Sequence, residues 1–152
     1  SPPPAGASGS SFSFSAVIFV IGILVAIALP TFLGARARAQ DKAAQSGLRN
    51  GFVAGKVFFT DGDTYSGFTP AMARQIEPSL SWVAGTPPTG PAEVSIVLAK
   101  GLQLLLVSRS DHGGFFCISA DEANTSSTTG YGEGPTFASV DSLAECSTGT
   151  WS

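Results

Sequence analysis

The hydrophobic pattern of this chain is dominated by an apolar run over residues 12–33, in which no side chain is charged. The first charged residue is Arg36. Roughly 20 apolar residues span the hydrocarbon core of a bilayer as a helix, so residues 12–35 are predicted to form a membrane-spanning helix. The run is longer than the apolar core of a cleavable secretion signal and no basic residue precedes it, so we expect the mature protein to retain it.

The helical pattern is predicted to continue past the apolar run, to about residue 59. The residues that follow the run are rich in alanine, glutamine and basic residues, which favour helices. Apolar residues recur on one face of this part, namely Ala37, Ala44, Leu48, Phe52 and Phe59. A helix over residues 12–59 would be on the order of 70 Å long. Its first half is apolar all round, whereas its second half has one apolar stripe that we expect to pack against a folded domain.

Two pairs of residues disturb this helix. Pro30 cannot donate a backbone hydrogen bond and Gly22 has high conformational freedom, so the helix is predicted to kink or loosen in this stretch. Gly51 and Gly55 each cost about 1 kcal/mol relative to alanine in a helix. Nothing in the local sequence explains these two glycines.

Three β-strands are predicted in the second half of the chain, over residues 93–99, 102–110 and 114–120. The connections at residues 100–101 and 111–114 contain glycine and suit hairpin turns. An antiparallel sheet of three or four strands, packed on the second half of the long helix, would bury the apolar faces of both. The predicted fold class is therefore α+β.

The remaining segments are predicted to be mostly irregular. Residues 1–11 are rich in Pro, Ser and Gly, which indicates a disordered or extended segment. Residues 61–67 form a turn-rich break, residues 70–80 contain a short helix ended by Pro78, and residues 123–152 form a polar loop. The predicted organisation is an N-terminal extension over residues 1–11, an apolar helix over residues 12–35 and a globular domain over residues 36–152.

Charge and cysteine content give opposite indications of orientation. The net charge of −3 leaves no basic footprint for nucleic acid. Cys117 and Cys146 follow a membrane segment in a domain rich in Ser, Thr and Gly, which predicts a disulfide and a location outside the cytoplasm. Closing a loop of this size would contribute on the order of 3 kcal/mol. Arg36, Arg38 and Lys42 directly follow the apolar run, and the positive-inside rule would place that side in the cytoplasm.

The stretch IGILVAIALPTFLGARARAQDKAAQSGLRN, residues 21–50, resembles the type IV pilin family. The resemblance rests on Gly-Ile-Leu-x-Ala-Ile-Ala-x-Pro, followed by Phe-Leu and a segment rich in Arg, Ala and Gln. Weaker matches lie in FFTDGDTYSG (58–67) and FCIS (116–119). The resemblance implies the type IV pilin fold, with a long N-terminal helix, a small antiparallel β-sheet and a disulfide-bounded C-terminal loop.

The resemblance also implies a function. The chain would be a structural subunit that polymerises through its apolar helix into an extracellular filament, without a cofactor or enzymatic activity. Adhesion, twitching motility and DNA uptake would all remain open. Gly22 and Pro30 would bound a stretch that loses helical structure on assembly. The residues that the resemblance places in the filament core are Val17, Ile18, Phe19, Ile21, Ile23, Leu24, Ile27, Leu29, Phe32 and Leu33.

The partners implied by the resemblance are other copies of the chain, the cytoplasmic membrane before assembly, and the pilus assembly machinery. A prepilin peptidase would remove a basic leader that sets the N-terminus inward. Such a leader would override the positive-inside signal of Arg36, Arg38 and Lys42.

The N-terminal end departs from the family pattern. When the family's proline is matched to Pro30, its glutamate falls at the position of Ser13 and its mature N-terminus at the position of Gly9. In the family this glutamate pairs with the N-terminal amine of a neighbour. With serine at this position, the registration of subunits would rest on packing. The departure favours an alternative role as a minor pilin or a type II secretion pseudopilin.

No set of residues predicts catalysis or metal binding. His112 follows Asp111 in a predicted turn, without a marked nucleophile. The Asp-Gly-Asp-Thr sequence at residues 61–64 lacks the further ligands of a calcium loop, and two cysteines with one histidine lack zinc-site spacing. A signal-anchored extracellular enzyme, the remote alternative, would need such a set. Asn124 begins an Asn-Thr-Ser sequon in a polar loop and is a candidate for glycosylation.

Overall fold

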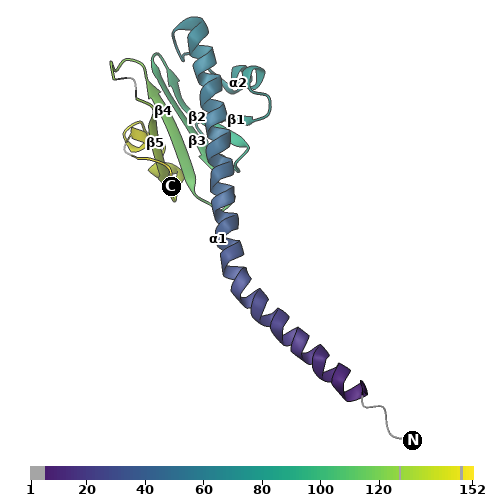
Figure 1. Cartoon of the computed structure of the whole chain (residues 1–152). Coiled ribbons are helices and arrows are strands. Elements are labelled where there is room, and N and C mark those ends of the chain that lie inside the picture. The colour runs from purple at the N-terminus through teal and green to yellow at the C-terminus, as the bar shows by residue number, and fades with distance from the viewer. Residues whose placement is uncertain (1–5, 127, 148) are drawn as a thin grey trace, which may run out of the picture. The chain divides into compact units, whose positions relative to one another are not determined.

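The computed structural model describes residues 6–126, 128–147 and 149–152. The chain forms two compact units, Ser1–Arg38 and Ala39–Ser152. Helix α1 (Gly6–Gly62) contributes to both units, and the other elements belong to the second unit (Figure 1). These are α2 (Pro70–Ile76), β1 (Ser81–Ala84), β2 (Glu93–Lys100), β3 (Gln103–Arg109), β4 (Phe115–Asp121), β5 (Gly130–Gly134) and two 3-10 turns, η1 (Phe137–Ser139) and η2 (Glu145–Ser147).

In the first unit, α1 begins earlier than the sequence predicts. The prediction of irregular structure over residues 6–11 is wrong, because the helix starts at Gly6. No proline lies in this stretch, so a helix that the apolar run has nucleated can extend through it without losing a backbone donor. The prediction for residues 1–5 lies outside the described residues. The helix is unbroken at Pro30, and the loosening of this stretch stays a prediction.

In the second unit, α1 buries the apolar stripe that the sequence predicts. Ala44 and Leu48 are fully buried, whereas Phe52 and Phe59 are partly buried against the same core. The glycines within this part of the helix are explained by close packing. A Cβ atom on Gly55 would lie 2.6 Å from Cδ2 of Leu104, which belongs to the sheet.

The sheet has five strands in the order β1-β2-β3-β4-β5. The three predicted strands are confirmed as β2, β3 and β4, which pair antiparallel through the predicted turns. The predicted antiparallel arrangement is confirmed except at β1, whereas the predicted number of three or four strands is wrong. β1 pairs parallel to β2, and β5 pairs antiparallel to β4. The C-terminal segment predicted as polar loop therefore contains a strand and two 3-10 turns as well as loop.

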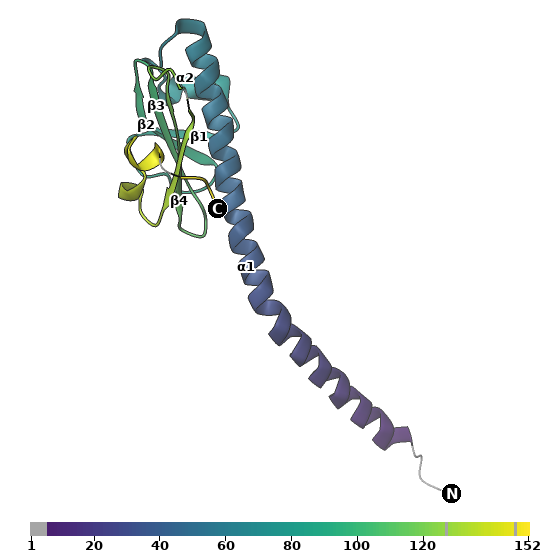
Figure 2. The same cartoon turned by 60° about the vertical axis from the view of Figure 1, so that its left-hand side comes forward.

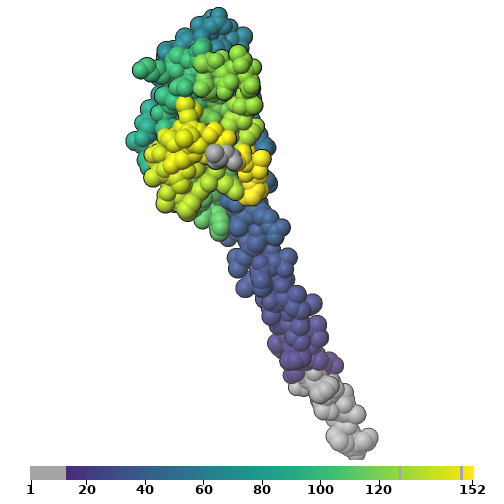
Figure 3. Space-filling model, turned by 90° about the vertical axis from the view of Figure 1, so that its left-hand side faces the viewer, coloured from purple at the N-terminus to yellow at the C-terminus, as the bar shows by residue number. Residues whose placement is uncertain are grey.

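Two apolar cores lie on the two faces of this sheet. On one face Val94, Leu104 and Ile118 pack with α1 residues such as Leu48. Figure 2 shows the second part of α1 running alongside the sheet. On the other face the buried residues are Leu105, Val107, Cys117, Val140 and Cys146. The C-terminal segment covers this second face, as the yellow atoms in Figure 3 show. The second unit is thus a sheet between a helix and a C-terminal loop.

Candidate functional site

The exposed apolar side chains of the described residues are concentrated in the first part of α1. Phe19 is 71% exposed and Ile27 is 68% exposed. By length and composition this part of α1 suffices to cross a membrane, and none of its apolar window is buried within the structure. Exposed apolar surface of this extent marks a site for lipid or another protein. All the side chains predicted for filament-core packing are exposed here: Val17, Ile18, Phe19, Ile21, Ile23, Leu24, Ile27, Leu29, Phe32 and Leu33.

Gly22 and Pro30 lie within this exposed part of α1. Nothing lies within 4 Å of a Cβ atom built on Gly22, so packing within the chain does not require glycine there. Pro30 lies inside the helix, where it removes one backbone donor. Ser13, at the position of the family glutamate, is exposed on the same helix. All three residues belong to the first unit.

The C-terminal loop is held by a disulfide between Cys117 on β4 and Cys146 in η2. The two Cα atoms are 5.9 Å apart and both side chains are fully buried. The predicted disulfide is therefore confirmed, and its sulfurs are not available as zinc ligands.

Glycines of β5 make room for this disulfide. The strand reads Gly-Tyr-Gly-Glu-Gly, so glycines occupy alternate positions on one face. A Cβ atom on Gly132 would lie 2.7 Å from the Glu145 carbonyl oxygen and 2.8 Å from Sγ of Cys117. The loop that contains Cys146 thus lies directly on the glycine face of β5. Glycine is depleted in strands, so the sequence of this segment does not predict a strand.

Trp151 links this edge of the sheet to α1. Its indole Nε1 donates to the carbonyl oxygens of Cys117, at 3.1 Å, and Gly132, at 3.2 Å. Its ring meets Tyr131 edge-on at a centroid distance of 4.9 Å. The Arg49 guanidinium of α1 lies 5.0 Å from the centroid of the Trp151 ring, in a cation–π contact.

A polar network joins the C-terminal end of α1 to the sheet. Glu122, directly after β4, accepts a hydrogen bond from the Tyr65 hydroxyl at 2.9 Å and pairs with the Lys56 ammonium. Tyr65 is fully buried. Burial and the neighbouring Glu122 carboxylate raise the pKa of Tyr65, because both disfavour the phenolate. This network is consistent with a structural role.

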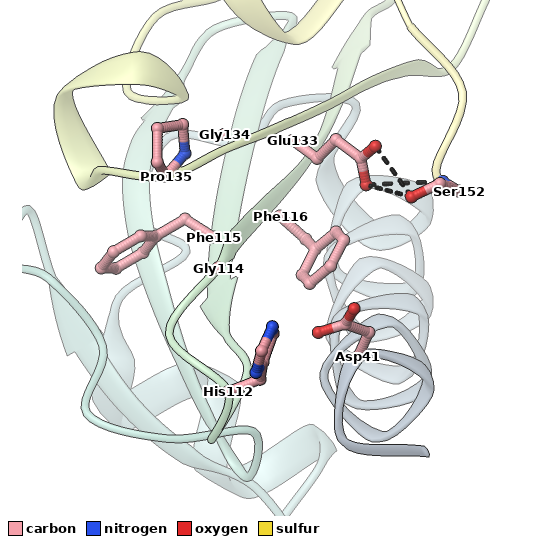
Figure 4. A pocket seen from close by; sticks show the side chains of 9 residues that line it. All are labelled: Asp41, His112, Gly114, Phe115, Phe116, Glu133, Gly134, Pro135 and Ser152. Atoms are coloured by element: carbon pink, nitrogen blue, oxygen red, sulfur yellow. Dashed lines mark hydrogen bonds between the residues drawn. The ribbon is translucent and has the colours of Figure 1, made fainter. Parts of the chain in front are cut away.

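The candidate polar site around His112 does not form a catalytic arrangement. Asp41, His112 and Glu133 face a shallow hollow of about 420 Å³ (Figure 4). The Ser152 hydroxyl lines the same hollow, but among the residues drawn there it donates to Glu133, at 2.9 Å, and not to His112. A nucleophile next to its base is therefore not present at this hollow. His112 lies in the β3–β4 turn, as predicted.

Metal binding has no support in the part of the chain that the structure describes. No group of three or more His, Cys, Asp or Glu side chains there is placed to hold a metal ion. The Asp-Gly-Asp-Thr segment contains the end of α1 and a turn in which Asp63 has a φ of 53°. Asn124 is exposed, and its Oδ1 atom accepts a hydrogen bond from the Ser126 amide at 3.2 Å.

Comparison with known proteins finds a protein that is similar to part of this chain. The chain is 36% identical over 75 residues to the Type IV major pilin protein PilA of Myxococcus xanthus (strain DK1622). The chain resembles a type IV pilin. The match covers 45% of this chain and 34% of the relative, so the chain spans about a third of that protein's length. No family model and no solved structure matches the chain.

The pilin resemblance agrees with the α+β fold, the long apolar helix and the disulfide.

Proposed function

We propose that this chain is a structural subunit of a type IV pilus and polymerises through the apolar part of α1 into an extracellular helical filament. The observation that carries the proposal is the exposure of every side chain over residues 13–33, a segment of α1 without charge. The proposal rests also on the similarity to a type IV major pilin.

The free energy of covering this surface is large. Full burial of one aliphatic or aromatic side chain contributes about 1.5–3 kcal/mol. Ten such side chains, each about half exposed, would therefore contribute on the order of 10 kcal/mol. A bilayer can cover the surface before assembly, and a bundle of helices from other copies can cover it afterwards. The same segment then serves as anchor and as assembly interface.

Gly22 and Pro30 fit a change of helical structure on assembly. Pro30 leaves one backbone carbonyl of α1 without its usual donor, and Gly22 makes the helix easier to unwind. The open surroundings of Gly22 support this role, because packing within the chain gives no other reason for glycine.

The proposed partners are other copies of the chain, the cytoplasmic membrane, a prepilin peptidase and a pilus assembly machinery. The proposed location is the cell surface. Adhesion, twitching motility and DNA uptake are each compatible with such a filament. Asn124 is proposed as a glycosylation site, because it is exposed within an Asn-Thr-Ser sequon.

A minor pilin or type II secretion pseudopilin is the second candidate, which the serine at position 13 favours. Electron microscopy of material sheared from cells with and without the gene separates the two. Filaments that vanish without the gene, and that consist mainly of this chain, are expected for the building block. Filaments that persist unchanged would assign the chain to a minor or secretion component.

A further inference from the structure

The outer face of α1 in the second unit carries an uncharged stripe with heptad spacing. Its members are all exposed and recur at intervals of four and three residues: Ala39, Ala43, Ser46, Asn50, Val53, Val57 and Thr60. Val53 is 60% exposed and Val57 is 46% exposed. A repeat of this spacing keeps one seam of a helix facing a partner helix. We call these seven residues the heptad face.

Charged residues flank the heptad face in the pattern that selects a partner helix. Lys42, Arg49 and Lys56 recur every seven residues along one flank. On the other flank Gly47 and Ala54 are buried within the unit, and the seven-residue series reaches the surface at Asp61, which is exposed. In paired helices these two flanks of neighbouring chains face each other, and their charges set partner and register.

Arg49 and Asp61 lie on these flanks without an ion-pair partner among the described residues. Lys56 forms a salt bridge with Glu122, and Lys42 donates hydrogen bonds within its own unit. The stacking of Arg49 on an indole ring fixes its guanidinium but leaves the N–H groups available for a carboxylate. A carboxylate from outside the chain would complete this site.

A second copy of the chain fits this site when it is offset by one heptad. Two parallel copies in register would place Arg49 opposite Ala54 and would close as a dimer. An offset of seven residues, about 10.5 Å along the helix, keeps the heptad face in phase and places Arg49 opposite Asp61 of the next copy. An offset contact of this kind leaves one half of the interface free at each end, so it propagates into a filament.

From these observations we infer that the heptad face binds a second copy of this chain, offset by one heptad, with Arg49 of one copy paired to Asp61 of the next. This interface rests on the proposed filament and names the contact that fixes its axial spacing. Asn50 of one copy would then face Val57 of the next.

Cysteine cross-linking in full-length chains, in sheared filaments, tests the offset. The variant with Asn50→Cys and Val57→Cys is expected to give a ladder of covalent oligomers on mild oxidation. Asn50→Cys alone, and Asn50→Cys with Val53→Cys, are the matched controls and are expected to stay monomeric. The native cysteines do not interfere because they form a buried disulfide. A covalent dimer from Asn50→Cys alone, or no ladder from the double variant although filaments form, would overturn the inference.

Charge reversal tests the ion pair. Arg49→Glu and Asp61→Arg are each expected to lower the amount of filament roughly fivefold, and the double variant is expected to restore it. If Arg49→Glu lowers the amount of filament only because it removes the Arg49–Trp151 contact, then adding Asp61→Arg will not restore that amount. A lack of restoration in the double variant therefore contradicts the inference. Lys100→Glu, at the exposed end of β2, is the control for net charge. If the unmodified chain forms no filaments at all, the proposed function fails, and the charge variants are not at issue.

Discussion

Gly47 provides the sharpest test of how the second unit is packed. It lies on the buried side of α1, where a Cβ atom would be 2.6 Å from the carbonyl oxygen of Pro91 and 3.6 Å from Cδ2 of Leu80. Replacing Gly47 with alanine adds this atom to a contact with backbone, which cannot rotate away as a side chain can. The helix and the loop that contains Pro91 would have to separate by several tenths of an ångström.

Two opposing effects determine the magnitude for Gly47→Ala. Alanine favours the helix over glycine by about 1 kcal/mol. Overpacking costs about 1–3 kcal/mol, and the close approach to a carbonyl oxygen places this site in the upper part of that range. The expected net loss is about 1–2 kcal/mol in the free energy of unfolding, which lowers the melting temperature by about 4–8 °C for a unit of this size.

Tryptophan fluorescence of the full-length chain in detergent micelles reports this unit alone, because Trp82 and Trp151 both lie in it. Gly62→Ala is the matched control, since the nearest atom to its Cβ is Cγ2 of Thr64 at 3.9 Å. This control is expected to leave the melting temperature unchanged or slightly raised. If Gly47→Ala melts as high as Gly62→Ala, the packing between α1 and the Pro91 loop is not as close as described.

Three further results are expected. Reduction of the Cys117–Cys146 disulfide should cost about 3 kcal/mol in the free energy of unfolding, and an unchanged urea midpoint with reductant would contradict this. The pKa of Tyr65 is raised in the folded state, so its contribution to stability is complete below pH of about 10 and is lost as the pH rises further, by about 1.4 kcal/mol per unit. Urea midpoints measured above pH of about 10 should fall less steeply for Tyr65→Phe than for Tyr131→Phe, and equal slopes would refute the assignment. Leu24→Asp places a charge in the apolar segment at a cost of about 3 kcal/mol, so less protein should pellet with membranes than for Leu24→Val, and equal pelleting would count against membrane insertion through this segment.

The parts of the fold that the sequence predicts correctly are those in which local pattern and tertiary role agree. β2, β3 and β4 are runs of apolar and β-branched residues separated by glycine-containing turns. β1 has only four residues and pairs parallel to β2, so neither its length nor a hairpin turn marks it. β5 contains three glycines in five residues, a composition that disfavours strands until β4 and the C-terminal loop are in place.

The glycines of α1 and the candidate sites also include features that the sequence alone does not explain. Gly51 and Gly55 have no explanation in the helix that contains them, because the atoms they avoid, in Trp82 and Leu104, come from distant strands. The disulfide could be predicted from cysteine content and membrane context. The heptad face could have been found from spacing alone, but its exposure, and the lack of an ion pair at Arg49 among the described residues, required the packed unit.

The glycine face of β5 has a consequence for the oxidation of the chain. Cys146 lies over Cys117 only where position 132 carries no side chain, because any Cβ atom there would collide with both the loop and the sulfur. A slip of one residue in the β4–β5 pairing would bring Tyr131 or Glu133 onto this face. Such a chain would keep its thiols reduced. The disulfide thus requires the native register of β4 and β5. Alkylation of free thiols would count the molecules in which these strands pair in another register.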